Sequence, residues 1–305
     1  MSTPFSYFFQ KSKVISPLKH DFTEVLGSIA LMPKMLYFYG KMPEKVLIDG
    51  VLKRPKSVAI VGARKHTNYG EEVTYRLAES LAREGVVVVS GLAMGIDAVA
   101  HRAALDAGGV TVAVLGTAID EISPRCNIGL AREIIESGGA VLSEYGSGER
   151  VFPKTSFLAR NRIIAGLADA VIVTEAAERS GSLNTATHAL EQGKDVLVVP
   201  GDVTRATSVG CNRLIQQGAM PCLAVEDVRD LLFPARGRKE CKRRSLRGDT
   251  EVETAILVVL AEGVSDGEKI IAKLGLAVTE FNQTITMLEI KGLVKSLGAN
   301  NWMLR

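Results

Sequence analysis

Ser57-Val-Ala-Ile-Val-Gly-Ala-Arg64 opens the part of the chain that decides the fold. An apolar β-branched run ends at Gly62, and a helical pattern of apolar residues follows from Gly70 to Glu84. This strand, glycine turn and helix then recur along the chain. The expected strands cover 57–61, 86–89, 110–115, 140–142, 170–174 and 196–199, and the expected helices cover 70–84, 96–107, 129–137, 158–167 and 183–192. Continuous apolar strands alternating with helices predict a doubly wound α/β fold with a parallel sheet.

Charge divides the chain into four parts. Residues 57–233, the predicted α/β domain, carry sixteen Lys/Arg against twenty-one Asp/Glu. Residues 1–56 are a basic N-terminal extension, in which Pro33 to Gly40 is predicted to be extended and to add to the sheet edge or pack under it. Residues 234–250, with seven Lys/Arg and two Asp/Glu, read as a basic linker. Because the central domain is net acidic, affinity for nucleic acid there must come from a local cluster of cations.

The last part, residues 251–305, predicts three helices followed by a two-stranded hairpin. That order is typical of a winged helix, a variant of the helix-turn-helix. Its third predicted helix, 278–291, is rich in Thr, Glu, Asn and Gln and has Lys only at its end. A helix that reads the major groove usually carries Arg or Lys. We therefore expect a protein-contact or weak accessory domain.

Several classes of protein are disfavoured by composition. No run of about 18 apolar residues indicates a membrane helix, and no signal peptide is recognisable. The four cysteines form no CxxC pair, so we expect reduced thiols in a cytoplasmic protein and no structural metal. Neither GxGxxG nor GxxxxGK[ST] occurs, which disfavours a nicotinamide or ATP cofactor. We expect no cofactor and no catalytic residue.

Glycine-rich polar turns follow the predicted strands, where backbone N–H groups at helix starts can face an anion. The candidate phosphate-loop residues are Gly62, Ser90, Gly91, Gly95, Ser180, Gly181, Ser182, Thr185, Ser208, Gly210 and Asn212. Arg64 lies just past the first strand and could grip a phosphate bidentately, or could instead pair with Glu71 or Glu72. Asp97 and His101 lie four residues apart and could form an acid/base pair, although a capping Asp and a packing His are favoured.

The most specific segment runs from Phe152 to Leu167. Its cations Lys154, Arg160 and Arg162 lie near Phe157 at the entry to a helix, and Asn161 separates the two arginines. Cations beside an aromatic ring that can stack on a base are typical of single-strand readers. The alternative is a set of structural salt bridges around a core Phe.

In this order, VAIVGARKHTNYG, SGLAMGIDAVAH, FLARNRIIAGLADA, SGSLNTATHALEQGK, VVPG and SVGCNRLIQQGA resemble the DNA-processing protein family called DprA or Smf. The resemblance covers about residues 57 to 233, with a looser match to the winged helix. It implies an extended Rossmann fold, binding and protection of incoming single-stranded DNA, a homodimer, and loading of the RecA recombinase in natural transformation.

The resemblance also implies DNA-binding roles for Arg64, Lys154, Phe157 and Arg160. Two departures stand out. The family usually has Ser or Thr before the first Arg, where this chain has Ala63. The helical N-terminal domain of many members is absent or reduced to the first 56 residues.

Two other functions stay open at this point. The first is a nucleotide phosphoribohydrolase on a related fold, with Glu175 at a strand end as its acid residue. The second is an adaptor that acts through the winged helix alone.

Overall fold

The computed structural model describes residues 12–48, 50–233, 249–261, 264–298 and 300–304. Two compact units divide the chain, Met1–Pro234 and Ala235–Arg305. Most of the basic segment 234–250, and Cys241 within it, lie outside the described residues. No helix of the described part is long and apolar enough to cross a membrane.

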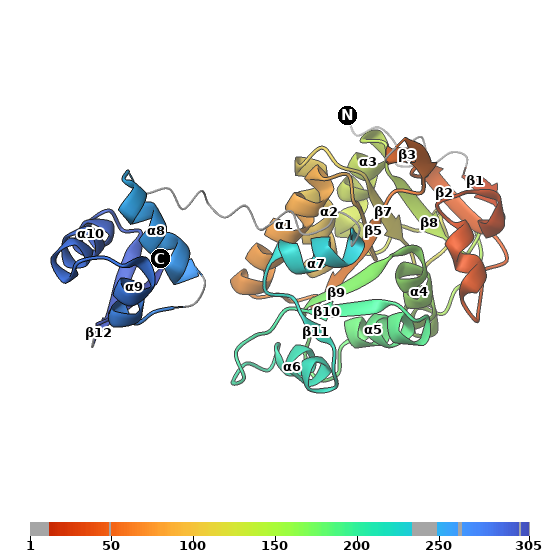
Figure 1. The fold of residues 1–305 in the computed structure, drawn as a ribbon. Coiled ribbons are helices and arrows are strands. Elements are labelled where there is room, and N and C mark those ends of the chain that lie inside the picture. Colours follow the sequence, from red (N-terminus) through yellow and green to blue (C-terminus); the bar gives the residue numbers. More distant parts are fainter. Residues whose placement is uncertain (1–11, 49, 234–248, 262–263, 299, 305) are drawn as a thin grey trace, which may run out of the picture. The chain divides into compact units, whose positions relative to one another are not determined.

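A large mixed sheet forms the centre of the first unit (Figure 1). Within the described residues its strand order is β1-β2-β8-β7-β6-β5-β9-β10-β11. The strands are β1 (Lys13–Ile15), β2 (Leu36–Gly40), β5 (Ser57–Gly62), β6 (Val87–Ser90), β7 (Thr111–Val114), β8 (Ala140–Ser143), β9 (Ala170–Glu175), β10 (Asp195–Val198) and β11 (Met220–Pro221). From β8 to β11 every neighbouring pair is parallel, as the sequence predicted.

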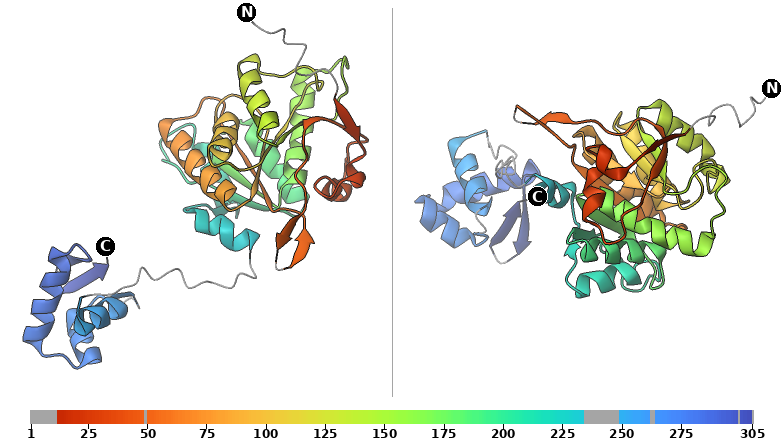
Figure 2. Two further views of the ribbon diagram at one scale, coloured as in Figure 1. Left: turned by 90° about the horizontal axis from the view of Figure 1, so that it is seen from above. Right: turned by 90° about the vertical axis from the view of Figure 1, so that its right-hand side faces the viewer.

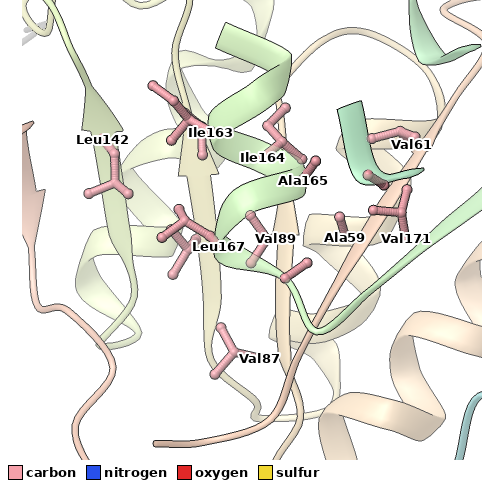
Figure 3. Close-up of a cluster of buried hydrophobic side chains, with 14 of the residues drawn as sticks. Ala59, Val61, Val87, Val89, Leu142, Ile163, Ile164, Ala165, Leu167 and Val171 are labelled. Carbon is pink, nitrogen blue, oxygen red and sulfur yellow. The ribbon is translucent and has the colours of Figure 1, made fainter. Parts of the chain in front are cut away.

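Helices cover both faces of this sheet. Successive side chains of β5 point to opposite faces and so pack into two separate cores. Val58 and Ile60 pack with helices on one face, whereas Ala59 and Val61 pack with helices on the other. The first face carries α1 (Asn68–Arg83), α2 (Ile96–Asp106), α3 (Ile128–Glu136) and α7 (Val225–Leu232). The second carries α4 (Pro153–Leu167), α5 (Gly181–Glu191) and α6 (Val209–Gln216). Figure 3 shows α4 against β5 and β6, with Ile163, Ile164 and Leu167 in the core.

The N-terminal residues complete the sheet edge. Strand β2 pairs antiparallel with β8, and β1 pairs antiparallel with β2. Of the two alternatives predicted for Pro33 to Gly40, addition to the sheet edge is confirmed, for Leu36–Gly40. Short 3₁₀ helices cover Pro17–Lys19, Glu24–Ser28 and Arg125–Asn127. The hairpin of β3 (Val46–Ile48) and β4 (Val51–Lys53) forms a sheet of its own and projects from the unit (Figure 2).

The second unit holds three helices followed by an antiparallel hairpin, in the predicted order. These are α8 (Glu251–Ala261), α9 (Gly267–Leu274), α10 (Val278–Ile290), β12 (Val294–Gly298) and β13 (Asn301–Leu304). Apolar side chains of the three helices, among them Ile256, Ile270 and Phe281, form a separate small core with Val294.

His101 belongs to α2, and its side chain is fully buried against the sheet. Its Nδ1 lies 2.7 Å from Oγ1 of Thr111, and that hydroxyl donates to the Val88 carbonyl. Because the Thr111 hydroxyl donates elsewhere, its oxygen accepts a hydrogen bond from Nδ1 of His101. His101 is therefore the neutral tautomer that carries its proton on Nδ1. Burial lowers the pKa of His101 to about 3, and the nearby charge of Arg160 acts in the same direction. His101 is thus a packing residue and forms no acid/base pair with Asp97.

We expect this histidine to make the first unit sensitive to acid. Its folded pKa of about 3 lies below the unfolded value of about 6.5, so the unfolded state binds the proton first. Stability is then lost as pH falls from about 6.5 towards 3, by at most ~1.4 kcal/mol per pH unit. Denaturant unfolding between about pH 6 and pH 4.5 should show a shallower slope for His101→Gln, measured against its own pH 7 stability. His188→Gln, a partly exposed control, should keep the wild-type slope; equal slopes in all three proteins would contradict the assignment.

Candidate nucleic-acid interface

A cavity of about 410 Å³ lies at the carboxyl ends of β5 and β9. From β5 the chain order runs outward in one direction through β6 and in the other through β9, so this is the topological switch point of the sheet. Open α/β sheets bind ligands at such points. The walls come from the loop after β5, from α4, and from the start of α5. The structure therefore brings three of the segments singled out by sequence into one site.

Phe157 is the aromatic wall of the cavity, and it lies between two arginines. The guanidinium carbon of Arg64 is 5.8 Å from the centre of its ring, and that of Arg160 is 5.9 Å away. Both distances are in the range of cation–π attraction. A side chain at Gly116 would place its Cβ 2.6 Å from the Phe157 ring, so the ring is packed against this backbone. Phe157 nevertheless remains partly exposed to solvent.

Arg160 supports the cavity from below. The side chain is buried, and it donates from Nη1 to the carbonyls of Gly91 (2.8 Å) and Val114. Its Nε donates to Oδ1 of Asn161. Burial lowers the pKa of Arg160 to about 10, while the charge of Asp97 opposes that shift. Nε and Nη1 of Arg160 are thus directed to the protein itself, and the residue also lines the cavity.

Asp97 holds the turn after β6. Its Oδ2 accepts from the backbone N–H of Gly91 (3.1 Å) and of Ala93 (3.4 Å). Burial raises the pKa of this carboxyl group, and Arg160 opposes the shift. A Cβ on Gly91 would lie 2.6 Å from Oδ2 of Asp97 and 2.7 Å from Nη2 of Arg160, so a larger residue there would displace these side chains. Asp97 therefore fixes the turn before α2 and does not cap that helix, whose N-cap residue is Gly95, so the prediction of a capping Asp was wrong.

Asn161 ties α4 to the start of α5. It donates from Nδ2 to the Gly181 carbonyl (3.2 Å) and to Oδ1 of Asn184 (3.1 Å). The space above Gly181 is open, with no atom within 4 Å of a built Cβ. Thr185 is a buried residue that lines the cavity, and its hydroxyl has no hydrogen-bond partner among the described residues. The amino end of α5 thus presents groups that can bind an anion.

Three exposed cations surround this opening, namely Arg64, Lys65 and Arg179. None of them forms an ion pair within the described part of the chain. The expected alternative for Arg64 is absent there, because Glu71 lies beside His66 and Glu72 pairs with Arg76. Lys65 and Arg179 were missed by the sequence analysis. Their positions directly beside two of the glycine turns were the available signal.

Several other predicted residues have structural contacts instead. Arg162 forms an ion pair with Glu144 at 2.6 Å, donates to the Leu31 carbonyl, and does not line the cavity. Ser90 is buried and donates to the Ile60 carbonyl. For Arg162, the ion pair with Glu144 therefore favours the alternative of a structural salt bridge. The side chain of Lys154 lies outside the described residues, although its backbone belongs to the first turn of α4.

The glycines of the other turns allow close backbone packing. Gly62 lines the cavity and packs on Ile96, and Gly95 has a positive φ of 82° and lies against the Ala63 carbonyl. Gly210 lies against the Ala177 carbonyl. Ser180 and Ser182 line the cavity, and their hydroxyl oxygens lie 2.7 Å apart.

Ser208 and Asn212 lie outside this cavity. Asn212 accepts from the N–H of Gly201 and donates to its carbonyl, and so fixes the loop after β10. Ser208 belongs to that loop and lines a second cavity. Of the predicted phosphate loops, the segment 180–185 faces the first cavity directly. The other loops shape the backbone nearby.

Glu175 lies at the amino end of α1, where Rossmann folds in general bind a phosphate. Its Oε2 accepts from the backbone N–H of Thr67 at 2.9 Å, at the start of α1. A Cβ on Gly70 would lie 2.1 Å from the same oxygen. The side chain is buried and does not line the cavity. This geometry does not support Glu175 as the acid residue of a phosphoribohydrolase.

Comparisons with known proteins agree with this architecture. The family model of DNA recombination-mediator protein A matches residues 13–233. DNA processing protein DprA of Streptococcus pneumoniae is 43% identical over 72% of this chain and 74% of its own length, and protein Smf of Escherichia coli is 36% identical over 87% of this chain and 73% of its own. The chain belongs to the DNA recombination-mediator protein A family, also called DprA or Smf.

Solved structures of two relatives have the same fold. The Streptococcus pneumoniae DNA processing protein A aligns with a TM-score of 0.62 and 41% identity, over 73% of this chain and 75% of that one. The Helicobacter pylori protein aligns with a TM-score of 0.64 and 31% identity, over 75% of this chain and 98% of that one. The latter structure concerns a single-stranded DNA binding mode of the Helicobacter protein.

Arg162, of the Arg160-Asn161-Arg162 motif, and Arg64, of the loop after β5, should respond differently to substitution. Arg162→Ala leaves the largely buried Glu144 without its partner, which should lower the free energy of unfolding by about 3 kcal/mol. Arg64→Ala, at an exposed side chain, should change it by less than about 0.5 kcal/mol. Chemical denaturation of both variants checks this, and equal destabilisation would contradict the assignment of Arg162 to the scaffold.

Proposed function

We propose that this chain binds single-stranded DNA at the cavity between β5 and β9 and acts there as a recombination mediator, without catalysing a reaction. The observation that carries the proposal is the partly exposed Phe157 ring, held between Arg64 and Arg160 and beside the amino end of α5. A ring can stack on any base, and nearby cations and N–H groups can bind the flanking phosphates. This combination suits a strand whose sequence is not read.

The side chains of the site take different roles in this proposal. Phe157 stacks on a base, while Arg64, Lys65 and Arg179 contact phosphates. Arg160 and Asn161, which also line the cavity, hold Phe157 and the start of α5 in place, and both remain proposed DNA contacts on the basis of the family motif. Lys154 remains a proposed phosphate contact on the basis of the family motif.

Family membership supports the remaining proposals. We propose that the protein protects incoming single strands and loads the RecA recombinase during natural transformation, in the cytoplasm and as a homodimer. The Helicobacter relative, 31% identical, is the neighbour whose described binding mode supports the ligand. We also propose the division into an N-terminal extension (1–56), the DNA-binding domain (57–233), a basic linker (234–250) and a winged helix (251–305).

Arg64→Ala and Phe157→Ala should each weaken oligo-dT binding. Loss of a base-stacking ring costs about 1–3 kcal/mol, so Phe157→Ala should weaken affinity about 5-fold to 150-fold at every salt concentration. Loss of a phosphate contact should reduce the slope of log K against log[salt] by about 0.7 for Arg64→Ala. Fluorescence anisotropy across a salt series measures both effects.

The matched control is Arg76→Ala, which removes an exposed arginine paired with Glu72 on α1, outside the cavity. It should leave both affinity and salt slope unchanged. Wild-type affinity in both site variants would overturn the proposed function. So would an equal loss in Arg76→Ala, because the effect would then depend on overall charge.

Deletion of 250–305 should leave oligo-dT binding within about 2-fold of the full chain, since the proposed cavity belongs wholly to the first compact unit. The same binding assay measures this. Loss of binding in a deletion variant that remains folded by circular dichroism would favour the adaptor function of the winged helix instead.

A further inference from the structure

A second cavity, of about 430 Å³, opens at the carboxyl end of β10. Its walls are the start of α1, with Thr67 and Tyr69, and the loop from Pro200 to Ser208. The sheet edge is the same one that holds the first cavity, because β10 is parallel to β9.

The two cavities share their bordering loops. In the loop after β5, Lys65 lines the first cavity and Thr67 the second. In the loop after β10, Thr207 lines the first cavity and Ser208 the second. Residues one or two positions apart lie within about 7 Å of each other along a chain. A DNA strand that leaves the first cavity over either loop therefore reaches the second within roughly two nucleotides.

Ser208 is the observation that points to a ligand here. It is 93% buried and lines the second cavity, and its hydroxyl has no hydrogen-bond partner among the described residues. It precedes α6 but does not cap that helix through its side chain. The unpartnered hydroxyl at the cavity wall is thus available to a ligand. A phosphate oxygen is an acceptor that would satisfy it.

Tyr69 and Arg205 supply the other contacts that a nucleotide needs. The Tyr69 hydroxyl donates to the Pro200 carbonyl at 2.9 Å, which fixes a ring that is 44% exposed. Arg205 is more than half exposed, and its distance of 3.8 Å to Asp202 marks a loose ion pair. The bonds from Asn212 to Gly201 hold the loop that carries them.

Among the described residues that line this cavity, Asp202 is the acidic one, and its charge determines the direction of change expected in one experiment. It accepts from the N–H and hydroxyl of Thr204, which lower its pKa and keep it ionised. Its charge would repel a phosphate bound beside Arg205.

We propose that the second cavity binds a further nucleotide of the same DNA strand, with its base on Tyr69 and its phosphate at Arg205 and Ser208. This rests on the proposed function, since it extends the strand held at Phe157. A short oligonucleotide would bind in the first cavity alone, and a longer one would bind in both cavities.

The test is the affinity of the full chain for oligo-dT of increasing length. In the wild type, affinity should rise by a step once the strand is long enough to span both cavities. Tyr69→Ala and Arg205→Ala should each remove most of that step, at least about 5-fold for the aromatic residue, while very short strands bind as before. Tyr69→Phe, which keeps the ring, should keep the step.

Two further variants separate a ligand contact from structural damage. Asp202→Asn retains an acceptor for Thr204 and removes the repulsive charge, so it should bind long strands more tightly than the wild type. Arg213→Ala removes an exposed arginine of α6 that pairs with Glu178 and lines neither cavity, so it should behave as the wild type.

The outcomes of this test and of the test of the proposed function are distinguishable. If Arg64→Ala weakens binding at every length but Tyr69→Ala and Arg205→Ala match the wild type throughout, the second cavity binds no nucleotide and the first one stands. If Tyr69→Ala or Arg205→Ala weakens short strands as strongly as long ones, a separate second subsite is contradicted. If no length of oligo-dT binds the wild type, both proposals fail together.

Discussion

The buried guanidinium of Arg160 is the interaction on which the site depends. Placing a cation in the interior costs several kcal/mol unless its donors are satisfied, and here two backbone carbonyls, Asn161 and the charge of Asp97 offset that cost. The carbonyls come from β7 and from the turn after β6, so one side chain links α4 to two strands. Phe157, one helical turn earlier, is held over the sheet edge as a result.

A second constraint determines where an anion can bind. In many Rossmann-like folds a phosphate lies at the amino end of the first helix. In this chain the carboxylate of Glu175 already occupies that end of α1. The free amino end nearest the switch point is that of α5, where Gly181 is open and Thr185 has no partner among the described residues. The cavity therefore lies between α4 and α5 and away from α1.

The sequence predicted the architecture well because its signals were local. The apolar strands, the glycine turns and even the extended Pro33–Gly40 segment follow from patterns within about ten residues. Helix α7 and strand β11 were not predicted, and α4 begins at Pro153, five residues before the expected start. Proline favours the first turn of a helix, so that earlier start was available as a signal.

The site was harder to predict because it depends on where side chains point. Arg160 and Arg162 are two residues apart, hence about 200° apart around α4, and cannot both face one cavity. Helical geometry could have separated them, but which one is buried depends on Glu144 and on the carbonyls beneath α4, which are distant in sequence. The same applies to Glu175, whose partner Thr67 lies 108 residues away.

Photo-crosslinking tests the central claim, that DNA lies against Phe157, most directly. An oligo-dT strand carrying 5-iodouracil is irradiated in complex with the full chain, and the adduct is mapped by peptide mass spectrometry. If DNA lies against Phe157, an adduct forms on Phe157 and disappears in Phe157→Leu. Adducts confined to 251–305, or an unchanged pattern in Phe157→Leu, would contradict that claim.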